Sequence, residues 1–335
     1  MLRGDSVPSF KHDRVTPAQI IILGFLLLIF TGAVLLMLPF STQEPGGASF
    51  GDALFTATSA TCVTGLVLHD TALYWSPFGQ LVILLLIQVG GMGVVTIAVA
   101  IFMFAGKRIG LKQRWVMQES ISAPQVGGIV RMTGFILKTA FLIEGIGALL
   151  LALRFCPQFG LGRGLWYAVF HSVSAFCNAG FDLMGVNSPF SSLTDYVGDP
   201  LVSNVIAFLI IIGGVGFLTW NDIREHKLHF RRYRLQSKLI LTTTLALILT
   251  GLLFFLLYEF EQGQWVDMSL WERINAAFFQ SVTPRTAGFN TVDLTGLSQP
   301  AQLLIILLML VGGSPGSTAG GFKTTTLAVM LLGIR

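Results

Sequence analysis

Residues 165–183 read LWYAVFHSVSAFCNAGFDL, an apolar and aromatic stretch that runs into a turn containing glycine. The same design occurs twice more, as DALFTATSATCVTGL at 52–66 and as INAAFFQSVTPRTAGFNTVDL at 274–294. The stretch before each turn provides about ten helical residues, which cover roughly 15 Å, only half of the hydrocarbon core of a bilayer. Each sequence therefore predicts a half-helix that enters a membrane and turns back, with its irregular end facing water or protein.

The composition around these stretches is that of a membrane protein. The chain has 335 residues, of which 53% are hydrophobic and 11% charged, and its mean hydropathy is +0.74. Soluble domains carry about 25% charged residues, so a water-soluble globule is excluded. A transmembrane β-barrel is excluded as well, because its strands would alternate apolar and polar residues. Continuous apolar runs long enough to cross a bilayer as helices occupy 20–38, 81–104, 202–220 and 239–258.

A second landmark follows each half-helix and indicates an internal repeat. QVGGMGVVT lies at 88–96, IGGVGFLT at 212–219 and VGGSPGSTAGGFKTTT at 311–326. The chain thus predicts span, half-helix, glycine turn and span three times, in one orientation because an even number of crossings separates the repeats. After the first two Gly-Gly pairs we expect continuous apolar helix. The predicted fold is an all-α polytopic membrane protein, potassium-channel-like, with repeated membrane-pore-membrane units around a pore axis and spans near 17–39, 77–105, 128–155, 200–220, 235–258 and 300–335.

The charges predict the topology of these units. Of the 21 Lys and Arg residues, 15 lie before the first span, between 107 and 138, or between 224 and 238. The positive-inside rule then places the N-terminus and the two basic loops in the cytoplasm of a cell whose plasma (inner) membrane the chain crosses several times. The opposite connections hold eleven acids, which either concentrate cations or are ordinary solvated loops. The predicted units are the cytoplasmic segment 1–16, repeat 1 (17–105), a cytoplasmic loop (106–127), repeat 2 (128–220), a second loop (221–234) and repeat 3 (235–335).

The glycine turns suit a cation. Each half-helix directs its carboxyl end, with about half a negative charge, toward the axis. The carbonyl groups that follow are free to replace the hydration shell of potassium. Gly65, Gly180 and Gly288 supply the positive φ that such a turn needs, and the lack of carboxylates beside them argues against calcium. The alternative is that these glycines only allow close helix packing, but three turns of one design argue against it.

The third Gly-Gly pair opens a segment that cannot continue a helix. GGSPGSTAGG at 312–321 combines proline with glycine and serine, which predicts a broken last span. Lys323 follows at once as a charge at membrane depth, and it either has a functional role there or extends to the cytoplasmic surface. Glu144 is the acid within a predicted span. It either pairs with Lys138 or Arg131 or hydrogen-bonds across helices.

Two further residues of the half-helix regions carry polar chemistry. Arg285 lies within the third turn and could repel cations. We favour the interpretation that it points sideways and ties down its half-helix through Glu272 or Asp293. His171 lies on the second half-helix and is interpreted as a packed, hydrogen-bonded histidine rather than a ligand.

These motifs resemble the Trk/Ktr/HKT superfamily of potassium transporters, and most closely the Ktr-type ion-translocating subunit. The resemblance rests on TATSATCVTGL, FHSVSAFCNAGF, FFQSVTPRTAGFN and GGSPGSTAGGFK, and it covers nearly the whole chain. It implies four repeats around one pore. The implied selectivity filter comprises Val63, Thr64, Gly65, Asn178, Ala179, Gly180, Thr286, Ala287 and Gly288. The implied intramembrane gate comprises Gly312, Gly313, Ser314, Pro315, Gly316, Ser317, Thr318, Ala319, Gly320, Gly321 and Lys323.

The resemblance also implies a function and partners. The chain would be the pore-forming subunit for potassium uptake across the plasma membrane, with Na⁺ as a candidate coupling ion and Gly65 favouring potassium. It would form a homodimer on a cytoplasmic ring of nucleotide-binding, RCK-type regulatory subunits. The basic segments 107–114 and 224–238 would dock that ring or contact anionic lipid of the bilayer. We expect no covalent cofactor, no structural metal site and no nucleic-acid partner.

Other classes of protein are disfavoured by what the sequence lacks. It contains no GxxxxGK[ST], GxGxxG, HExxH or Ser-His-Asp pattern, so an enzyme is not expected. Cys62, Cys156 and Cys177 do not suggest a disulfide framework. The spacing of the three turns places a fourth beyond Arg335, so we expect a truncated member that lacks repeat 4. The alternatives are a non-conducting fragment that packs with other membrane subunits and a secondary transporter of another small solute, which would have inverted repeats.

Overall fold

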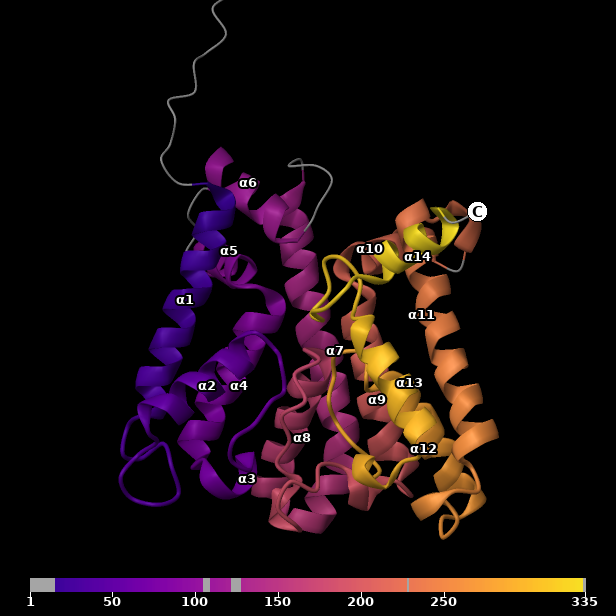
Figure 1. Cartoon of the computed structure of the whole chain (residues 1–335). Coiled ribbons are helices and arrows are strands. Elements are labelled where there is room, and N and C mark those ends of the chain that lie inside the picture. The colour runs from indigo at the N-terminus through magenta and orange to yellow at the C-terminus, as the bar shows by residue number, and fades with distance from the viewer. Residues whose placement is uncertain (1–15, 105–108, 122–127, 228, 334–335) are drawn as a thin grey trace, which may run out of the picture.

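The computed structural model describes residues 16–104, 109–121, 128–227 and 229–333 (Figure 1). Most of the predicted N-terminal segment and parts of the first cytoplasmic loop, with Lys107 and Arg108, lie outside these residues. Throughout the described ranges the chain is helical or irregular, and β-pairing is limited to the isolated bridges Thr42–Trp75 and Val311–Phe322. The predicted all-α fold class is therefore confirmed.

The first predicted repeat begins with a well-capped helix. The Thr16 hydroxyl accepts from the Gln19 amide while the Gln19 side chain accepts from the Thr16 amide, and Pro17 occupies the first turn. The Ser49 and Ser76 hydroxyls cap two later helices by accepting from the amides of Asp52 and Gly79. The elements are α1 (Pro17–Leu36), α2 (Phe50–Thr61), α3 (Thr71–Tyr74), α4 (Pro77–Met92), α5 (Val94–Phe104) and, on the side of the basic loops, α6 (Leu111–Ser120).

The second predicted repeat contains the longest helix of the chain. Gly160, with a φ of 82°, ends this helix and allows the half-helix to fold back against it. The remaining elements are short 3₁₀ turns and a pair of helices that meet at Gly216. In order, the elements are α7 (Ile129–Phe159), α8 (Leu161–Phe176), η1 (Met184–Val186), η2 (Thr194–Tyr196), α9 (Pro200–Val215), α10 (Phe217–His226) and η3 (Phe230–Arg232).

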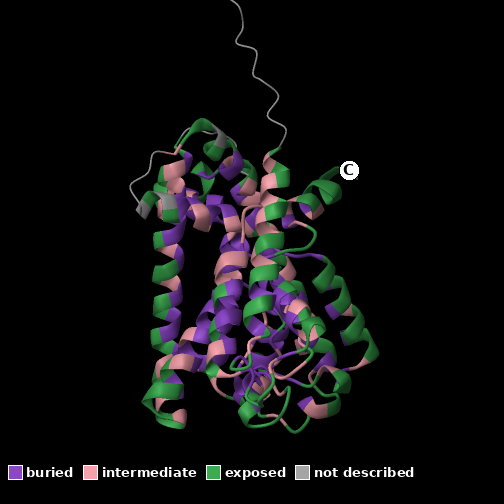
Figure 2. Ribbon diagram, turned by 90° about the vertical axis from the view of Figure 1, so that its left-hand side faces the viewer, coloured by how far each residue is buried: buried purple, intermediate pink, exposed green. Residues whose placement is uncertain are grey.

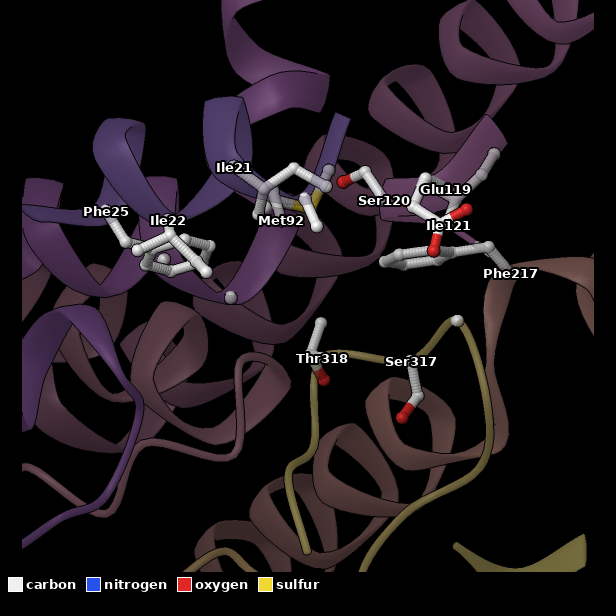
Figure 3. A pocket seen from close by; sticks show the side chains of 15 residues that line it. Ile21, Ile22, Phe25, Met92, Glu119, Ser120, Ile121, Phe217, Ser317 and Thr318 are labelled. Carbon is white, nitrogen blue, oxygen red and sulfur yellow. The ribbon is translucent and has the colours of Figure 1, made fainter. Parts of the chain in front are cut away.

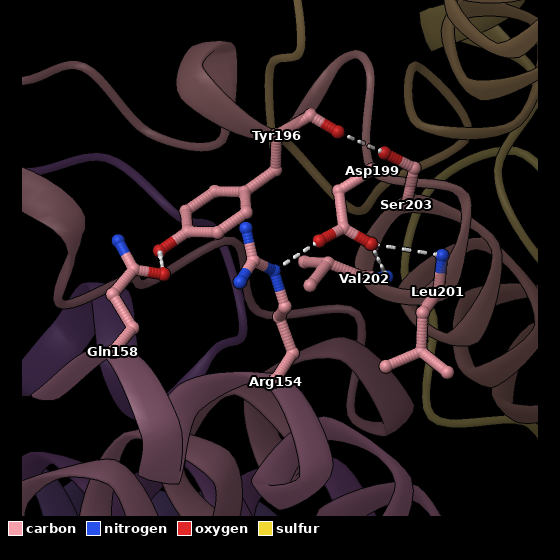
Figure 4. Close-up of polar contacts among 7 residues, drawn as sticks. All are labelled: Arg154, Gln158, Tyr196, Asp199, Leu201, Val202 and Ser203. Carbon is pink, nitrogen blue, oxygen red and sulfur yellow. Dashed lines mark hydrogen bonds and ion pairs between the residues drawn. The ribbon is translucent and has the colours of Figure 1, made fainter. Parts of the chain in front are cut away.

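A polar cluster ties the C-terminal end of α7 to the start of α9 (Figure 4). Arg154 Nε donates to Asp199 Oδ2 at 2.5 Å, and the other carboxylate oxygen of Asp199 caps α9. The Tyr196 hydroxyl donates to Gln158 Oε1 at 2.9 Å, and the Ser203 hydroxyl donates to the Tyr196 carbonyl at 2.7 Å. Burial raises the pKa of Tyr196 to about 12, so its phenol stays neutral and remains a donor.

The third predicted repeat has the same plan with a different ending. Its half-helix starts with a complete capping box between Ser269 and Glu272. Its last two helices are separated by thirteen residues that form no helix. The elements are α11 (Leu235–Phe254), the π-helical turn η4 (Phe255–Glu259), η5 (Gly263–Trp265), α12 (Leu270–Val282), η6 (Leu294–Gly296), α13 (Gln299–Leu310) and α14 (Thr324–Gly333).

The spans differ from the expectation in one respect. Helix α1, helix α7 and the continuous segment Leu235–Glu259 are long and apolar enough to cross a membrane. The pair α4 and α5 is bent by 98° and the pair α9 and α10 by 94°, so the prediction of continuous helix after the first two Gly-Gly pairs is wrong. The reason is that Gly93 and Gly216 adopt φ values of 83° and 96°, which no helix contains, and a new helix starts at the next residue.

The half-helices lie inside the bundle formed by the longer helices. Figure 1 shows α2, α8 and α12 in one half of the molecule and α6, α10 and α14 at the opposite end. Helix α4 contacts both α2 and α8, and α9 contacts both α8 and α12. Figure 2 shows that buried residues gather between the repeats, whereas the flank of α1 is exposed. Leu27 on this flank is 70% exposed, as expected for a side chain that faces lipid.

Candidate ion-conduction site

The three half-helices end in turns with the same unusual backbone. The predicted positive φ at the three glycines is present, and a residue two positions earlier also has positive φ. The pairs are Val63 (56°) and Gly65 (78°), Asn178 (57°) and Gly180 (71°), and Thr286 (69°) and Gly288 (88°). A β-branched residue such as Val63 or Thr286 is rarely found in this region, where an L-residue costs about 1–2 kcal/mol. Strain of this kind gathers at functional sites.

This backbone pattern has a consequence for the carbonyl groups. Residues that alternate between the left-handed region and the ordinary regions turn successive peptide units to one side of the chain. A turn of this kind can present several carbonyl oxygens to one axis, which is the arrangement that replaces a hydration shell in a potassium filter. Sequence reasoning identified the glycines but missed the strained residue before each of them, because valine, asparagine and threonine carry no common signal for it.

The three turns meet at one place although they are far apart in the sequence. A Cβ on Gly65 would lie 2.7 Å from the Ala179 carbonyl oxygen, and a Cβ on Gly180 would collide with the Ala287 carbonyl oxygen. A Cβ on Gly288 would lie 3.8 Å from the Gly180 Cα. The structure thus brings the predicted filter residues of all three repeats together, backbone against backbone. Simple helix packing would instead place these glycines against the side of another helix.

A hydroxyl group holds two of the turns from within. The Ser174 hydroxyl donates to the Phe181 carbonyl at 2.6 Å, and the Thr283 hydroxyl donates to the Phe289 carbonyl at 2.6 Å. Each bond fixes the carbonyl that follows the turn glycine. Ser59 is the corresponding residue of the first turn, but its buried hydroxyl has no hydrogen-bond partner among the described residues. The first turn is therefore held less firmly than the other two.

A buried histidine braces the second half-helix. His171 is fully buried. Its Nδ1 lies 2.7 Å from the Tyr167 carbonyl and its Nε2 accepts from the Leu183 amide at 3.2 Å. Because Nε2 is an acceptor, the proton is assigned to Nδ1, and both ring nitrogens form hydrogen bonds within the protein. The interpretation of His171 as a packed, hydrogen-bonded histidine is confirmed.

Glu144 joins three helices rather than forming an ion pair. Gln88 Nε2 on α4 donates to both carboxylate oxygens of Glu144 on α7, at 3.0 and 3.2 Å. The Ser172 hydroxyl on α8 donates to the Glu144 backbone carbonyl at 2.7 Å. Among the described residues Glu144 pairs with neither Lys138 nor Arg131, so the alternative of a hydrogen bond across helices is correct.

Arg285 does not form the expected tie. Its side chain is buried, and its Nε has no hydrogen-bond partner in the part of the chain that the structure describes. Glu272 is used by the capping box with Ser269, and Asp293 accepts from the Thr295 amide and hydroxyl. These hydrogen bonds lower the pKa of both carboxyl groups. The favoured link from Arg285 to either acid is therefore wrong, because local caps already occupy both acids.

The predicted gate segment is an irregular loop that pairs with itself. Residues 311–323, all of them described, contain no helix. The Gly312 amide donates to the Phe322 carbonyl at 2.9 Å, and the Gly313 amide donates to the Gly320 carbonyl at 3.2 Å. These bonds close the loop at its base, as expected where free backbone groups at membrane depth need partners.

The loop is docked on the bend between α9 and α10. This bend interrupts a helix and leaves backbone donors and acceptors without helical partners. Three backbone hydrogen bonds from the loop supply them, from the Ser314 amide to the Gly214 carbonyl (2.9 Å), from the Thr318 amide to the Gly213 carbonyl (3.3 Å) and from the Phe217 amide to the Gly316 carbonyl (2.7 Å). The loop and the bend therefore form one hydrogen-bonded unit.

One side chain connects this unit to a filter turn. The Thr318 hydroxyl lies 2.9 Å from the Phe176 carbonyl and 3.2 Å from Asn178 Oδ1. The Lys323 ammonium group turns back into the loop and donates to the Ala319 carbonyl at 2.9 Å, rather than extending to the surface. Sequence reasoning did not assign Thr318 this contact, because no local signal names a partner about 140 residues earlier in the chain.

A cavity of about 430 Å³ lies between the loop and helices α1 and α6 (Figure 3). It is bounded by α1, by the first bend at 90–93, by the end of α6 and by the loop residues 316–318. The volume is enough for several water molecules, each of which takes about 30 Å³. The tip of the loop closes against α6, since a Cβ on Gly316 would lie 2.7 Å from the Ile121 carbonyl oxygen.

Comparisons with known proteins agree with this geometry. The TrkH family model, described as a cation transport protein, matches residues 7–335. The potassium/sodium uptake protein NtpJ of Enterococcus hirae is 42% identical over 321 residues, which is 96% of this chain and 70% of that protein. The Ktr system potassium uptake protein B of Bacillus subtilis is 44% identical over 325 residues, or 97% of this chain and 71% of that protein. In fold, the crystal structure of the potassium transporter TrkH from Vibrio parahaemolyticus aligns with a TM-score of 0.70 and 20% identity, covering 96% of this chain and 62% of that one.

Proposed function

This chain belongs to the TrkH family of cation transport proteins, and we propose that it carries out potassium uptake through a pore whose filter is built from its three glycine turns. Because this family consists of ion transporters, the expectation that the chain is not an enzyme is confirmed. The relatives named above are potassium or potassium/sodium uptake proteins, which supports K⁺ as the transported ion and Na⁺ as a candidate coupling ion.

The observation that carries the proposal is the meeting of three turns that each contain the same pair of residues with positive φ. Each turn follows the carboxyl end of a half-helix, where the helix dipole favours a cation by about half a charge. The filter residues are then Val63-Thr64-Gly65, Asn178-Ala179-Gly180 and Thr286-Ala287-Gly288, which act through their carbonyl oxygens. A site made only of carbonyl groups favours weakly hydrated monovalent ions over calcium.

The loop at 312–321 is the proposed gate. Its contact with the second filter turn through Thr318 and its hydrogen bonds to the bend support a position next to the proposed ion path. Small residues and the self-paired base allow the loop to move as a unit between two arrangements. Lys323 adds a positive charge beside the path and stabilises the closed arrangement through Ala319.

The proposed orientation places the N-terminus and the basic segments in the cytoplasm. The printed names of several relatives describe a Ktr or Trk system, which supports further subunits. A homodimer on a ring of RCK-type regulatory subunits, docked at 224–238, is the proposed assembly. Labelling of engineered cysteines from outside the cell tests the orientation. Sites at 43–48 and 262–266 should react, and reaction at 229–232 would reverse the orientation.

Uptake of radioactive rubidium tests the function. Bacteria that lack their own potassium uptake should gain saturable rubidium uptake when they express the protein, and K⁺ should compete better than Na⁺. Failure to raise uptake, with the protein present in the membrane, would favour a non-conducting packing subunit. Competition by an organic solute instead of K⁺ would favour a secondary transporter.

A substitution in the filter tests the assigned residues. Gly288→Ser adds a Cβ at a φ of 88°, where strain of about 1–2 kcal/mol acts on the turn. We expect roughly tenfold weaker preference for potassium with unchanged membrane insertion. Gly162→Ser is the matched control, because its Cβ would meet no atom within 4 Å. Equal potassium affinity in the two variants would contradict the filter assignment.

A further inference from the structure

A short segment of the outer connection in repeat 2 links the stretches of chain that follow the three filter turns. The segment 190–193 lies between η1 and η2 and contains two strained residues, Phe190 with a φ of 59° and Ser192 with a φ of 49°. Neither is glycine, so the surrounding structure must hold both in the left-handed region. We call this segment the outer clamp.

The clamp is tied to repeat 1 by a single carboxylate. Asp70 Oδ2 accepts from the Phe190 amide at 2.8 Å, while Oδ1 of the same side chain caps α3. Asp70 also lies against Gly185, where a Cβ would collide with the carboxylate. The chain that leaves the first filter turn is therefore attached to the strained part of the clamp.

Ser192 joins the chains that leave the second and third turns. Its hydroxyl oxygen accepts from the Asn290 amide at 3.1 Å, which leaves the hydroxyl proton free to donate. Ser192 itself lies on the chain that leaves the second turn, twelve residues after Gly180. Asn290 follows Gly288 by two residues, so this bond ties the chain after the second turn to the start of the chain after the third turn.

A further backbone bond completes the clamp. The Leu193 amide donates to the Asn290 carbonyl at 2.8 Å, and Leu193 is fully buried. Both backbone groups of Asn290 are thus held by adjacent residues of the clamp. A shift of the third turn away from the second would break both bonds together.

We propose that Ser192 is a positioning residue for ion selectivity, which sets the separation of the second and third filter turns from outside by holding Asn290 against the chain that leaves the second turn. This inference rests on the proposed filter, because the separation of the turns matters only if their carbonyl groups bind the ion. Carbonyl groups select among ions by number and spacing, so a looser ring accepts Na⁺ more readily.

Hydrogen exchange of the purified protein tests the clamp without transport. In Ser192→Ala the Asn290 amide loses its acceptor, and exchange in peptides covering 286–294 should become roughly fivefold faster. Ser191→Ala is the matched control, since the Ser191 hydroxyl bonds only within the loop, to the Met184 carbonyl. Ser192→Gly relieves the strained φ but also lacks the hydroxyl, and should behave like Ser192→Ala.

Rubidium uptake tests the consequence for the filter. Ser192→Ala should raise the KM for rubidium and strengthen competition by Na⁺ several-fold, with a smaller change in maximal rate, while Ser191→Ala should change neither. Asp70→Asn is a second variant, because asparagine has one acceptor oxygen where two are used, and it should act in the same direction.

The possible outcomes separate the clamp from the proposed function. Equal exchange in the two serine variants would overturn the clamp. Faster exchange with unchanged KM and Na⁺ competition would overturn its role in selectivity. If the unsubstituted protein takes up no rubidium, the proposed function fails, while the exchange measurement still decides whether the clamp exists.

Discussion

The second and third repeats interrupt their last span at the same place but in different ways. After the Gly-Gly pair of repeat 2, Gly216 alone turns the chain by 94° and the helix restarts at Phe217. In repeat 3 the helix ends at Leu310, just before the Gly-Gly pair, and no helix starts again until Thr324. The difference lies in Pro315 and the glycines and serines around it, which prevent an immediate restart.

The comparison shows that the two interruptions depend on each other. A sharp bend leaves only a few backbone groups without partners, whereas a thirteen-residue loop leaves many. Some backbone groups of the loop pair with one another at its base, and others pair with the bend of repeat 2. The first repeat has a similar bend at Gly93, but the atoms near a Cβ there belong to the side chains of Ser120 and Thr96 and not to the loop. A bend therefore needs only its own glycine, whereas the loop also needs contacts with the bend of another repeat.

Removal of the loop should give the largest effect. Deletion of residues 314–319 eliminates all three hydrogen bonds to the bend, each worth about 1 kcal/mol. Rubidium uptake should rise by about tenfold or more, because the closed arrangement loses its support. Loss of uptake by protein that still reaches the membrane would show that the loop is a structural support and that the gate assignment is wrong.

The bends themselves should respond differently to the same substitution. Gly216→Ala and Gly93→Ala each place a side chain at positive φ, at a cost of about 1–2 kcal/mol, so both should lower the melting temperature similarly. At Gly216 the new Cβ would also lie 2.9 Å from the Pro315 carbonyl oxygen. Uptake should therefore rise several-fold in Gly216→Ala and stay unchanged in Gly93→Ala. An equal rise in both variants would mean that bending, and not loop docking, controls the gate.

The contact between the loop and the filter should give a moderate effect. Thr318→Val keeps the shape of the side chain but removes the hydroxyl that reaches the Phe176 carbonyl. Loss of one hydrogen bond of about 1 kcal/mol should raise uptake roughly fivefold. Thr318→Ser keeps the hydroxyl and should stay close to the unsubstituted protein. If serine and valine have the same uptake, the hydroxyl does not hold the loop.

The smallest effect should come from Lys323. Its bond to the Ala319 carbonyl is one contact within the loop, and the ammonium group is only half-buried, so solvent weakens this contact. Lys323→Ala should raise uptake about twofold. Lys238→Ala is the control, because Lys238 makes a similar bond to the Arg231 carbonyl away from the loop. A larger change of uptake in Lys238→Ala would point to the basic segment 224–238 instead of the loop.

The features that the sequence predicted correctly depend on neighbours in the chain. The half-helices follow from the length of their apolar stretches, and the end of α13 follows from Pro315 and its small neighbours. The three turn glycines could be named because a positive φ favours one residue type. The angle at Gly216 could not be predicted, since glycine permits a bend without requiring one.

The features that were missed or wrong depend on which partners the folded chain makes available to a residue. The positive φ of Val63 and Thr286 is imposed by the packing of three turns against one another, against the preference of both residues. Arg285 was linked to Glu272 or Asp293 by charge, but each acid is taken by the cap of its own segment. Charge alone does not show which partner is nearer.

The amino-acid sequence by itself determined that the chain is helical, lies in a membrane and repeats one plan three times, because hydrophobic length, charge and helix breakers act over a few residues. The tertiary structure alone decided that Gly65, Gly180 and Gly288 meet, that the loop docks on the second bend and that Ser192 joins two turns. These contacts join segments that are roughly a hundred or more residues apart. They form because backbone groups that leave a helix inside a membrane must find partners, and only the folded arrangement determines which partners are within reach.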